Sequence, residues 1–130
     1  MTPLEALADA VMMFEGWHRD SRSWRNRNPG NLRPLNSTVP HDNENYRIFV
    51  SLAQGFQALL DDLAAKFDGS HNLTGQSTML DLLNVYAPAG DHNSPSTYCL
   101  FVTRWVSAAL NRQIDSRTTL ADFRDPISKT

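Results

Sequence analysis

The sequence predicts one mainly α-helical domain over residues 1–130, of the α+β type, with a small hairpin or irregular loop insertion after the first helix. Two observations predict this class. Apolar residues recur at helical spacing in several separate segments, whereas residues 16–45 are rich in Gly, Pro, Asn and Ser. The length of 130 residues suits a single domain with one core, and no repeat, low-complexity segment or linker divides it.

Composition argues against several classes of protein. The 12 basic and 14 acidic residues leave a net charge of −2, which disfavours a bulk nucleic-acid binder. Cys99 is the only cysteine, so no internal disulfide can form, and its helical context indicates a small core residue. No stretch approaches the roughly 18 apolar residues of a membrane span. The N-terminus lacks the features of a signal peptide, which leaves localisation open.

The first predicted helix runs to about residue 15. Thr2 and Glu5 have the spacing of a capping box, Pro3 suits the first helical position, and apolar residues follow at helical spacing. Residues 16–45 are predicted to form loops and a small hairpin, with a strong turn signal at Pro29–Gly30–Asn31. Alternating residues from Tyr46 to Val50 favour a short strand.

Three further helices and a last short turn follow. Ser51 and Gln54 open a helix whose predicted core face is Leu52, Phe56, Leu59, Leu60, Leu63 and Phe67. Thr78 with Asp81 begins the next helix, which must end near Pro88. Ser94–Pro95 begins the last long helix, and Thr119 with Asp122 a final turn. The predicted core stripe of that long helix is Tyr98, Phe101, Val102, Trp105, Val106 and Ala109.

Glu15 is an unusual residue for the end of the first helix. Successive helical residues are about 100° apart, which places Glu15 within roughly 20° of Leu4 and Ala8, on the apolar side. A carboxylate in the last turn also faces the negative end of the helix dipole. Both effects favour the neutral acid, which suits general acid catalysis near neutral pH. A salt bridge to Arg19 or Arg22 at a frayed helix end is the structural alternative.

The residues after Glu15 resemble the lysozyme-like superfamily, especially lytic transglycosylases and goose-type lysozymes. The likeness lies in a helix-terminal Glu, the serines Ser21 and Ser23, and the run Asn28-Pro29-Gly30-Asn31-Leu32-Arg33. Residues 46–63 are similar to a segment of bacterial N-acetylglucosaminidases and related peptidoglycan hydrolases. Residues 85–98 are similar to the loop that closes the transglycosylase cleft. The resemblance covers about residues 4–106 and implies a lysozyme-like fold that acts on peptidoglycan, with Glu15 as the catalytic acid and Tyr86 near it.

Cleavage of a β-1,4 bond between N-acetylated sugars requires a proton on the leaving oxygen and stabilisation of an oxocarbenium-like state. A second carboxylate opposite Glu15 would make an ordinary hydrolase, and Asp20, Asp42 and Glu44 are the candidates. Without one, the substrate's acetamido group or 6-hydroxyl would take part, as in transglycosylases. The chain has Leu32-Arg33-Pro34 where the transglycosylase turn continues into Leu-Met-Gln, so both routes remain open.

Substrate-binding candidates follow from side-chain chemistry. Amides and hydroxyls suit sugar hydroxyl and acetamido groups, and tyrosines offer apolar faces with polar tips. The candidates are Ser23, Asn28, Asn31, Tyr46, Tyr86 and Tyr98. Asn also forms turns with positive φ, and that structural interpretation stays open. Either Ser21 or Ser23 would orient Glu15 by a hydrogen bond.

Other functions remain as alternatives. The chain would also suit a noncatalytic wall-binding or virion structural module with this fold. Five arginines between residues 19 and 33, with Trp17 and Trp24, form a weaker case for a small nucleic-acid-binding domain. The four histidines are scattered, so we expect neither a metal nor a cofactor. The expected partner is peptidoglycan or a related N-acetylated glycan, bound by a monomer.

Overall fold

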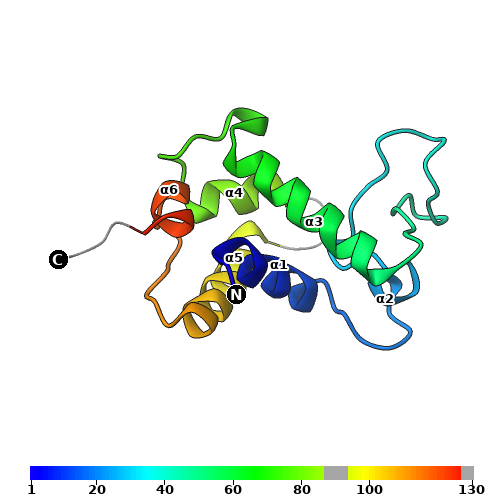
Figure 1. Ribbon diagram of the computed structural model, residues 1–130, viewed down its shortest axis with the longest axis horizontal. Coiled ribbons are helices and arrows are strands. Elements are labelled where there is room, and N and C mark those ends of the chain that lie inside the picture. Colours follow the sequence, from blue (N-terminus) through cyan, green and yellow to red (C-terminus); the bar gives the residue numbers. More distant parts are fainter. Residues whose placement is uncertain (87–93, 127–130) are drawn as a thin grey trace.

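A computed structural model describes residues 1–86 and 94–126 of the chain. The described residues are mainly helical (Figure 1), which confirms the predicted fold class. The α-helices are α1 (Pro3–Phe14), α2 (Arg22–Arg25), α3 (Leu52–Phe67), α4 (Met79–Tyr86), α5 (Pro95–Leu110) and α6 (Leu120–Arg124), and η1 (Ser70–Asn72) is a 3-10 turn. No sheet forms among these residues, which contain only the isolated bridges His41–Arg47 and Thr78–Thr119.

Side-chain caps set the helix boundaries. In α1, the Thr2 hydroxyl accepts from the Glu5 N–H at 3.1 Å and the Glu5 carboxylate accepts from the Thr2 N–H at 2.8 Å, which is a complete capping box. Thr78 and Asp81 exchange the same pair of hydrogen bonds at the start of α4. Helix α1 ends at Phe14, and Glu15 is its C-cap, as the sequence predicts to within one residue.

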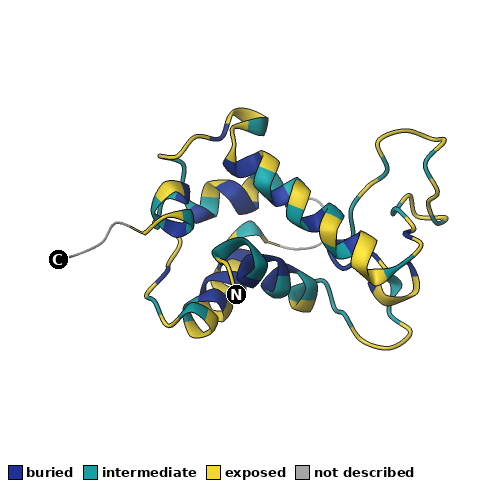
Figure 2. Cartoon of the chain, in the orientation of Figure 1, coloured by how far each residue is buried: buried dark blue, intermediate teal, exposed yellow. Residues whose placement is uncertain are grey.

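The core lies where α1, α3, α4 and α5 meet. Helix α1 packs mainly against α5 and α3, and α4 packs against α5. Buried residues in Figure 2 follow the inner faces of these helices. Removal of this apolar surface from water is the main stabilising contribution to the fold. The largest fully buried apolar side chains include Leu7, Leu59, Leu63, Leu82, Leu83, Val102, Val106 and Phe123.

The insertion between α1 and α3 extends to one side of the helices (Figure 1) and rests on the first turn of α3. Gly55 makes this approach possible, because a Cβ at that position would lie 1.9 Å from the carbonyl oxygen of Arg27. Further along, the Phe49 N–H donates to the Asn26 carbonyl at 2.8 Å. The insertion is therefore attached to the helical part by direct backbone contact.

Some sequence predictions about the helices and strand were wrong. Residues 46–50 form no strand, because only Arg47 pairs in a bridge and Val50 is 82% exposed. Leu52, predicted for the core, is 43% exposed at the start of α3, where that helix extends past its neighbours towards α2. The sequence also missed α2 and η1. The predicted helix end near Pro88 lies outside the described residues.

The outer face of α5 departs from its predicted stripe. Trp105 is 38% exposed, and its ring stacks on that of Phe101 with 5.9 Å between the centroids. Ala109 is exposed as well. The apolar stripe of α5 is therefore narrower than predicted and contains Tyr98, Val102 and Val106.

Candidate functional site

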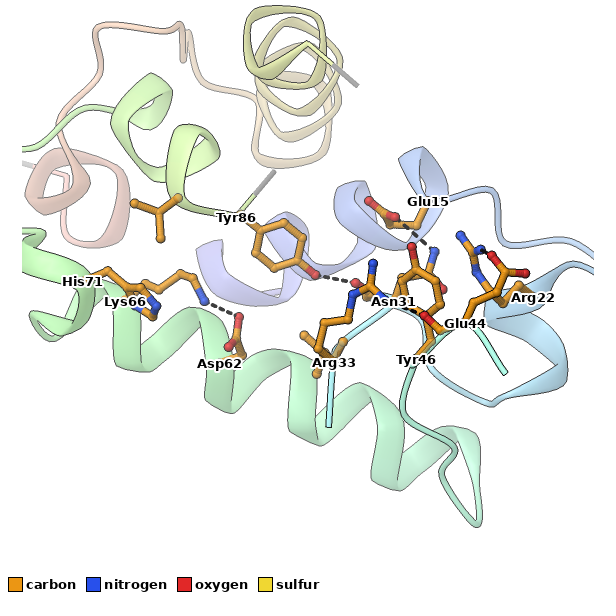
Figure 3. A pocket seen from close by; sticks show the side chains of 13 residues that line it. Glu15, Arg22, Asn31, Arg33, Glu44, Tyr46, Asp62, Lys66, His71 and Tyr86 are labelled. Carbon is orange, nitrogen blue, oxygen red and sulfur yellow. Dashed lines mark hydrogen bonds and ion pairs between the residues drawn. The ribbon is translucent and has the colours of Figure 1, made fainter. Parts of the chain in front are cut away.

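A cleft of about 450 Å³ lies between the insertion and the helices (Figure 3). Its walls come from the end of α1, from α2 and the insertion, from α3 and η1, and from the end of α4. The lining residues are Glu15, Arg22, Gly30, Asn31, Leu32, Arg33, Glu44, Tyr46, Asp62, Lys66, His71, Val85 and Tyr86. Glu15 and Tyr86, which the resemblance implies to lie near each other, both line it.

Glu15 is held at both carboxylate oxygens. The Asn31 amide donates to Oε1 at 3.0 Å, and the Tyr98 hydroxyl donates to Oε2 at 2.8 Å. Asn31 is 16 residues away in the chain and Tyr98 is 83 residues away, so tertiary structure builds this arrangement. Neither Arg19 nor Arg22 pairs with Glu15 in the described chain, so the predicted alternative of a salt bridge does not form.

Tyr98 is a partner of Glu15 and does not reach the cleft. It is fully buried in α5, and its ring lies 3.9 Å from the ring of Phe14, centroid to centroid. Burial, then the nearby Tyr86 and Glu15, raise the pKa of the Tyr98 hydroxyl. Tyr98 therefore stays a neutral donor to Glu15. The prediction that Tyr98 contacts substrate conflicts with this burial.

Tyr86 holds the turn that carries Asn31. Its hydroxyl donates to the Gly30 carbonyl at 2.7 Å, across 56 residues of sequence. Burial raises the pKa of Tyr86, and the nearby Glu15 and Asp62 raise it further, so the hydroxyl stays protonated. A Cβ on Gly30 would lie 2.6 Å from the Tyr86 oxygen and 2.7 Å from Leu59 Cδ1. Only glycine fits beneath Tyr86, which explains the glycine of the Pro-Gly-Asn turn.

Asn31 contributes to the site through its backbone conformation and through its side-chain amide. Its φ of +48° lies in the left-handed region, which Asn tolerates better than most residues. Its amide nitrogen faces Glu15, and its Oδ1 is buried without a hydrogen-bond partner in the described chain. Asn31 therefore combines the predicted turn role with a direct contact to the candidate catalytic carboxylate.

Asn28 is a structural residue beneath the turn. It is fully buried, and its amide donates to the carbonyls of Leu32 at 3.0 Å and Arg47 at 2.8 Å, while its Oδ1 accepts from the Leu32 N–H. All three contacts are to main chain, so Asn28 ties the turn to the region near Arg47. The predicted role of Asn28 in substrate binding does not agree with this position.

The two serines do not orient Glu15. Ser21 caps α2 by accepting from the Trp24 N–H, and Ser23 is buried with its hydroxyl 3.4 Å from that of Ser21. No hydrogen bond joins either serine to Glu15 in the described chain, so this expectation was wrong. Burial likewise keeps Ser23 away from substrate, and it is absent from the cleft lining.

Tyr46 lines the cleft with both ring faces covered. The guanidinium of Arg22 and that of Arg33 each lie 3.8 Å from the ring centroid. These contacts leave the edge and the hydroxyl of Tyr46 for the cleft. A sugar ring cannot stack on Tyr46 in this arrangement, which corrects the predicted use of its apolar face.

The candidate second carboxylates occupy three different settings. Asp20 is exposed, with a positive φ of 68°, and does not line the cleft. Asp42 accepts hydrogen bonds from the Glu44 and Tyr46 N–H groups at 2.9 Å each and from the Asn26 amide at 2.7 Å. Burial raises the pKa of Asp42, but these hydrogen bonds outweigh it and lower the pKa. Glu44 lines the cleft and pairs with Arg22 at 2.9 Å.

The sequence prediction missed Asp62 and Lys66 in the cleft wall. They form an ion pair at 2.6 Å on successive turns of α3, with Lys66 only 6% exposed and 5.5 Å from the Tyr86 ring centroid. A signal was present, because Lys66 falls seven residues after Leu59 and three after Leu63, on the apolar face of the helix. A lysine on a core face indicates a buried pair or a polar site.

Two further features bear on chemistry. Burial, with Asp115 nearby, raises the pKa of the Cys99 thiol to about 11, so this side chain stays uncharged.

No group of three or more His, Cys, Asp or Glu residues in the described ranges is placed to hold a metal ion. In the same ranges, no helix has the length and apolarity to cross a membrane.

Comparisons with known proteins leave the site to be interpreted on its geometry. No family model matches the chain, no curated protein matches it, and no solved structure matches it.

Proposed function

We propose that this chain is a glycosidase that cleaves peptidoglycan at β-1,4 bonds between N-acetylated sugars, with Glu15 as the general acid and base. One observation carries the proposal: the Glu15 carboxylate, at the end of α1, lines the cleft and accepts a hydrogen bond at each oxygen, from Asn31 and from Tyr98. The cleft volume of about 450 Å³ is within the range of sites for small ligands and sugar units.

The surroundings of Glu15 suit a residue that both donates and accepts a proton. Tyr98 and Asn31 restrict the carboxylate to one orientation, which is the preorganisation that acid–base catalysis needs. A protonated Glu15 gives its proton to the leaving glycosidic oxygen. The resulting carboxylate is then stabilised by the two donors and accepts a proton from the attacking group in the second half of the reaction.

The remaining cleft carboxylates favour participation by the substrate itself. Glu44 pairs with Arg22 and Asp62 pairs with Lys66, so each is already neutralised by a cation. An oxocarbenium-like state therefore gains less from them than from a free carboxylate. We expect the substrate's own 6-hydroxyl to attack the anomeric carbon and give its proton to Glu15, with or without prior participation of the acetamido group, so that fragments end in 1,6-anhydro sugars. Exclusively reducing ends would instead identify water as the nucleophile, assisted either by the acetamido group or by Glu44 or Asp62 as the second carboxylate.

The decisive experiment is Glu15→Gln, tested on purified peptidoglycan by turbidity clearance and by mass analysis of the released fragments. General acid–base catalysis contributes about 10²- to 10⁴-fold, so clearance is expected to fall by roughly that factor. The stability change is expected to be small, because an amide retains the contact to Tyr98. After a flip of Asn31, its unpartnered Oδ1 can also accept from the new amide.

Asp20→Asn is the matched control, since it removes an exposed carboxylate outside the cleft and should retain full activity. A fully active Glu15→Gln variant contradicts the proposed role of Glu15. A wild-type protein that binds peptidoglycan without releasing fragments supports the noncatalytic wall-binding module instead.

A further inference from the structure

The cleft continues into a second, larger hollow of about 970 Å³, which Arg33 also lines. The two share Leu32, Arg33, Asp62, Lys66 and His71, so together they form one groove along α3. A long ligand in the Glu15 cleft therefore has direct access to the hollow.

The hollow presents two arginines that have no carboxylate within 4.0 Å in the described chain, Arg33 and Arg47. Each guanidinium lies over an aromatic ring: Arg33 is 3.8 Å from the Tyr46 centroid, and Arg47 is 4.5 Å from that of Phe49. Arg33 also donates through one nitrogen to the carbonyls of Glu44 and Asn45. These contacts fix the position of two cations and leave further N–H donors for a ligand.

One unpaired anion lies on the opposite wall. Asp61 is exposed on α3, accepts from the Gln57 amide at 2.8 Å, and has no cation within 4.0 Å in the described chain. The other charged pair in the hollow, Asp62 with Lys66, is internally neutralised. The hollow thus offers two binding groups for carboxylates and one for an amine.

Resting on the proposed function, we propose that this hollow binds the short acidic peptide branch of peptidoglycan, with the branch carboxylates on Arg33 and Arg47 and its diamino-acid amine near Asp61. A peptide-free glycan strand keeps one lactyl carboxylate on each muramic residue, but it has neither the branch carboxylates nor the branch amine. A guanidinium binds a carboxylate through two parallel hydrogen bonds, which gives the contact both strength and orientation. The substrate class is therefore the peptide-bearing strand, and the Glu15 cleft receives the glycan to which the branch is attached.

The test measures binding separately from cleavage. The Glu15→Gln protein is titrated with two soluble muropeptide probes, a tetrasaccharide that carries its peptide branches and the same tetrasaccharide after amidase removal of those branches. We expect about tenfold tighter binding of the peptide-bearing probe at low salt, with a loss of that preference as salt rises. Arg47→Gln in this background should reduce the preference several-fold and leave affinity for the peptide-free probe unchanged.

Arg47 is the better variant because its side chain makes no hydrogen bond in the described chain, whereas Arg33 also anchors the main chain of the insertion. Arg104→Gln, an exposed arginine of α5 outside both cavities, is the matched control and should behave like the parent protein. Equal affinity for the two probes, or an unchanged preference in Arg47→Gln, overturns the inference.

A cleavage assay with the wild-type protein, on strands with and without the peptide branches, then separates the two proposals. Cleavage of both strands without any peptide preference in binding retains the proposed function and removes the peptide site. Peptide-dependent binding without cleavage of either strand retains the peptide site and overturns the enzyme.

Discussion

Different interactions stabilise the helical part and the insertion of residues 16–50. The helical part buries apolar side chains such as Leu7, Leu63 and Val102. The insertion has few buried apolar side chains, but it contains three of the buried polar residues of the described chain, Ser23, Asn26 and Asn28. Hydrogen bonds from side chains to main chain replace apolar burial there, as the three contacts of Asn28 illustrate.

This difference explains how the candidate site is built. Glu15 and Tyr98 come from the helical part, whereas Asn31 comes from the insertion, and the cleft follows the boundary between the two. Overall stability should therefore depend on the helical part. Catalytic geometry should depend equally on the polar contacts of the insertion, which each contribute only about 1 kcal/mol to stability.

A core truncation tests the contribution of the helical part. Leu63 is 1% exposed in α3, so Leu63→Ala leaves a cavity and should lower the free energy of unfolding by about 2–5 kcal/mol. Urea unfolding followed by circular dichroism gives this value. The fraction of active protein should follow the fraction folded. A loss of activity at urea concentrations below the unfolding transition would contradict the view that the helical part determines stability and not catalytic geometry.

The contact between the two parts is tested at Gly55. Gly55→Ala places a Cβ 1.9 Å from the Arg27 carbonyl, so the insertion must move away from α3. We expect a loss of about 3 kcal/mol, at the upper end for an overpacked site, with a large loss of wall-degrading activity. The control is Ala53→Gly in the same helix turn, an exposed position where glycine costs only about 1 kcal/mol.

A polar contact of the insertion is tested at Asn28. Asn28→Ala leaves the carbonyls of Leu32 and Arg47 and the Leu32 N–H without their partner, which should cost about 1–3 kcal/mol. Because Asn31 follows on the same turn, activity measured well below the melting range should fall by more than the small loss of folded protein explains. Preserved activity in a destabilised protein would show that the turn does not determine the position of Asn31.

The same division separates what the sequence predicts from what it does not. Helical periodicity and caps are local signals, so the ends of α1 at Thr2 and Glu15 and the start of α4 at Thr78 could be predicted. That Glu15 and Tyr86 line one cleft agrees with the expectation from the family resemblance and not with any spacing in the sequence. The fold class follows from these local patterns.

The details of the insertion depend on contacts between distant residues. Asn28 and Asn31 are both turn-forming amides in sequence, and only the tertiary structure shows that one is buried under the turn while the other bonds Glu15. The covered ring of Tyr46 depends in the same way on Arg22 and Arg33. Spacing in the sequence gives no information about such contacts.

The smallest expected effect concerns Asp42, whose three accepted hydrogen bonds organise the turn before Tyr46. Its pKa in the folded chain is lowered, although burial alone would raise it, because those hydrogen bonds favour the carboxylate. The stabilisation is complete above the unfolded-state pKa of about 3.9 and is lost as pH falls through the lower folded-state pKa. Partial exposure limits the effect to less than about 1 kcal/mol.

Asp42→Asn should therefore be less stable than the wild type at pH 6, and the two should converge as pH approaches 2 in urea unfolding experiments. Asp20→Asn, which removes an exposed carboxylate without these contacts, should run parallel to the wild type over the same pH range. If the Asp42→Asn curve also runs parallel, the Asp42 carboxylate contributes nothing specific as an anion. The turn before Tyr46 would then be held by hydrogen bonds that a neutral amide at position 42 accepts equally well, and its stabilisation would not depend on the charge of that side chain.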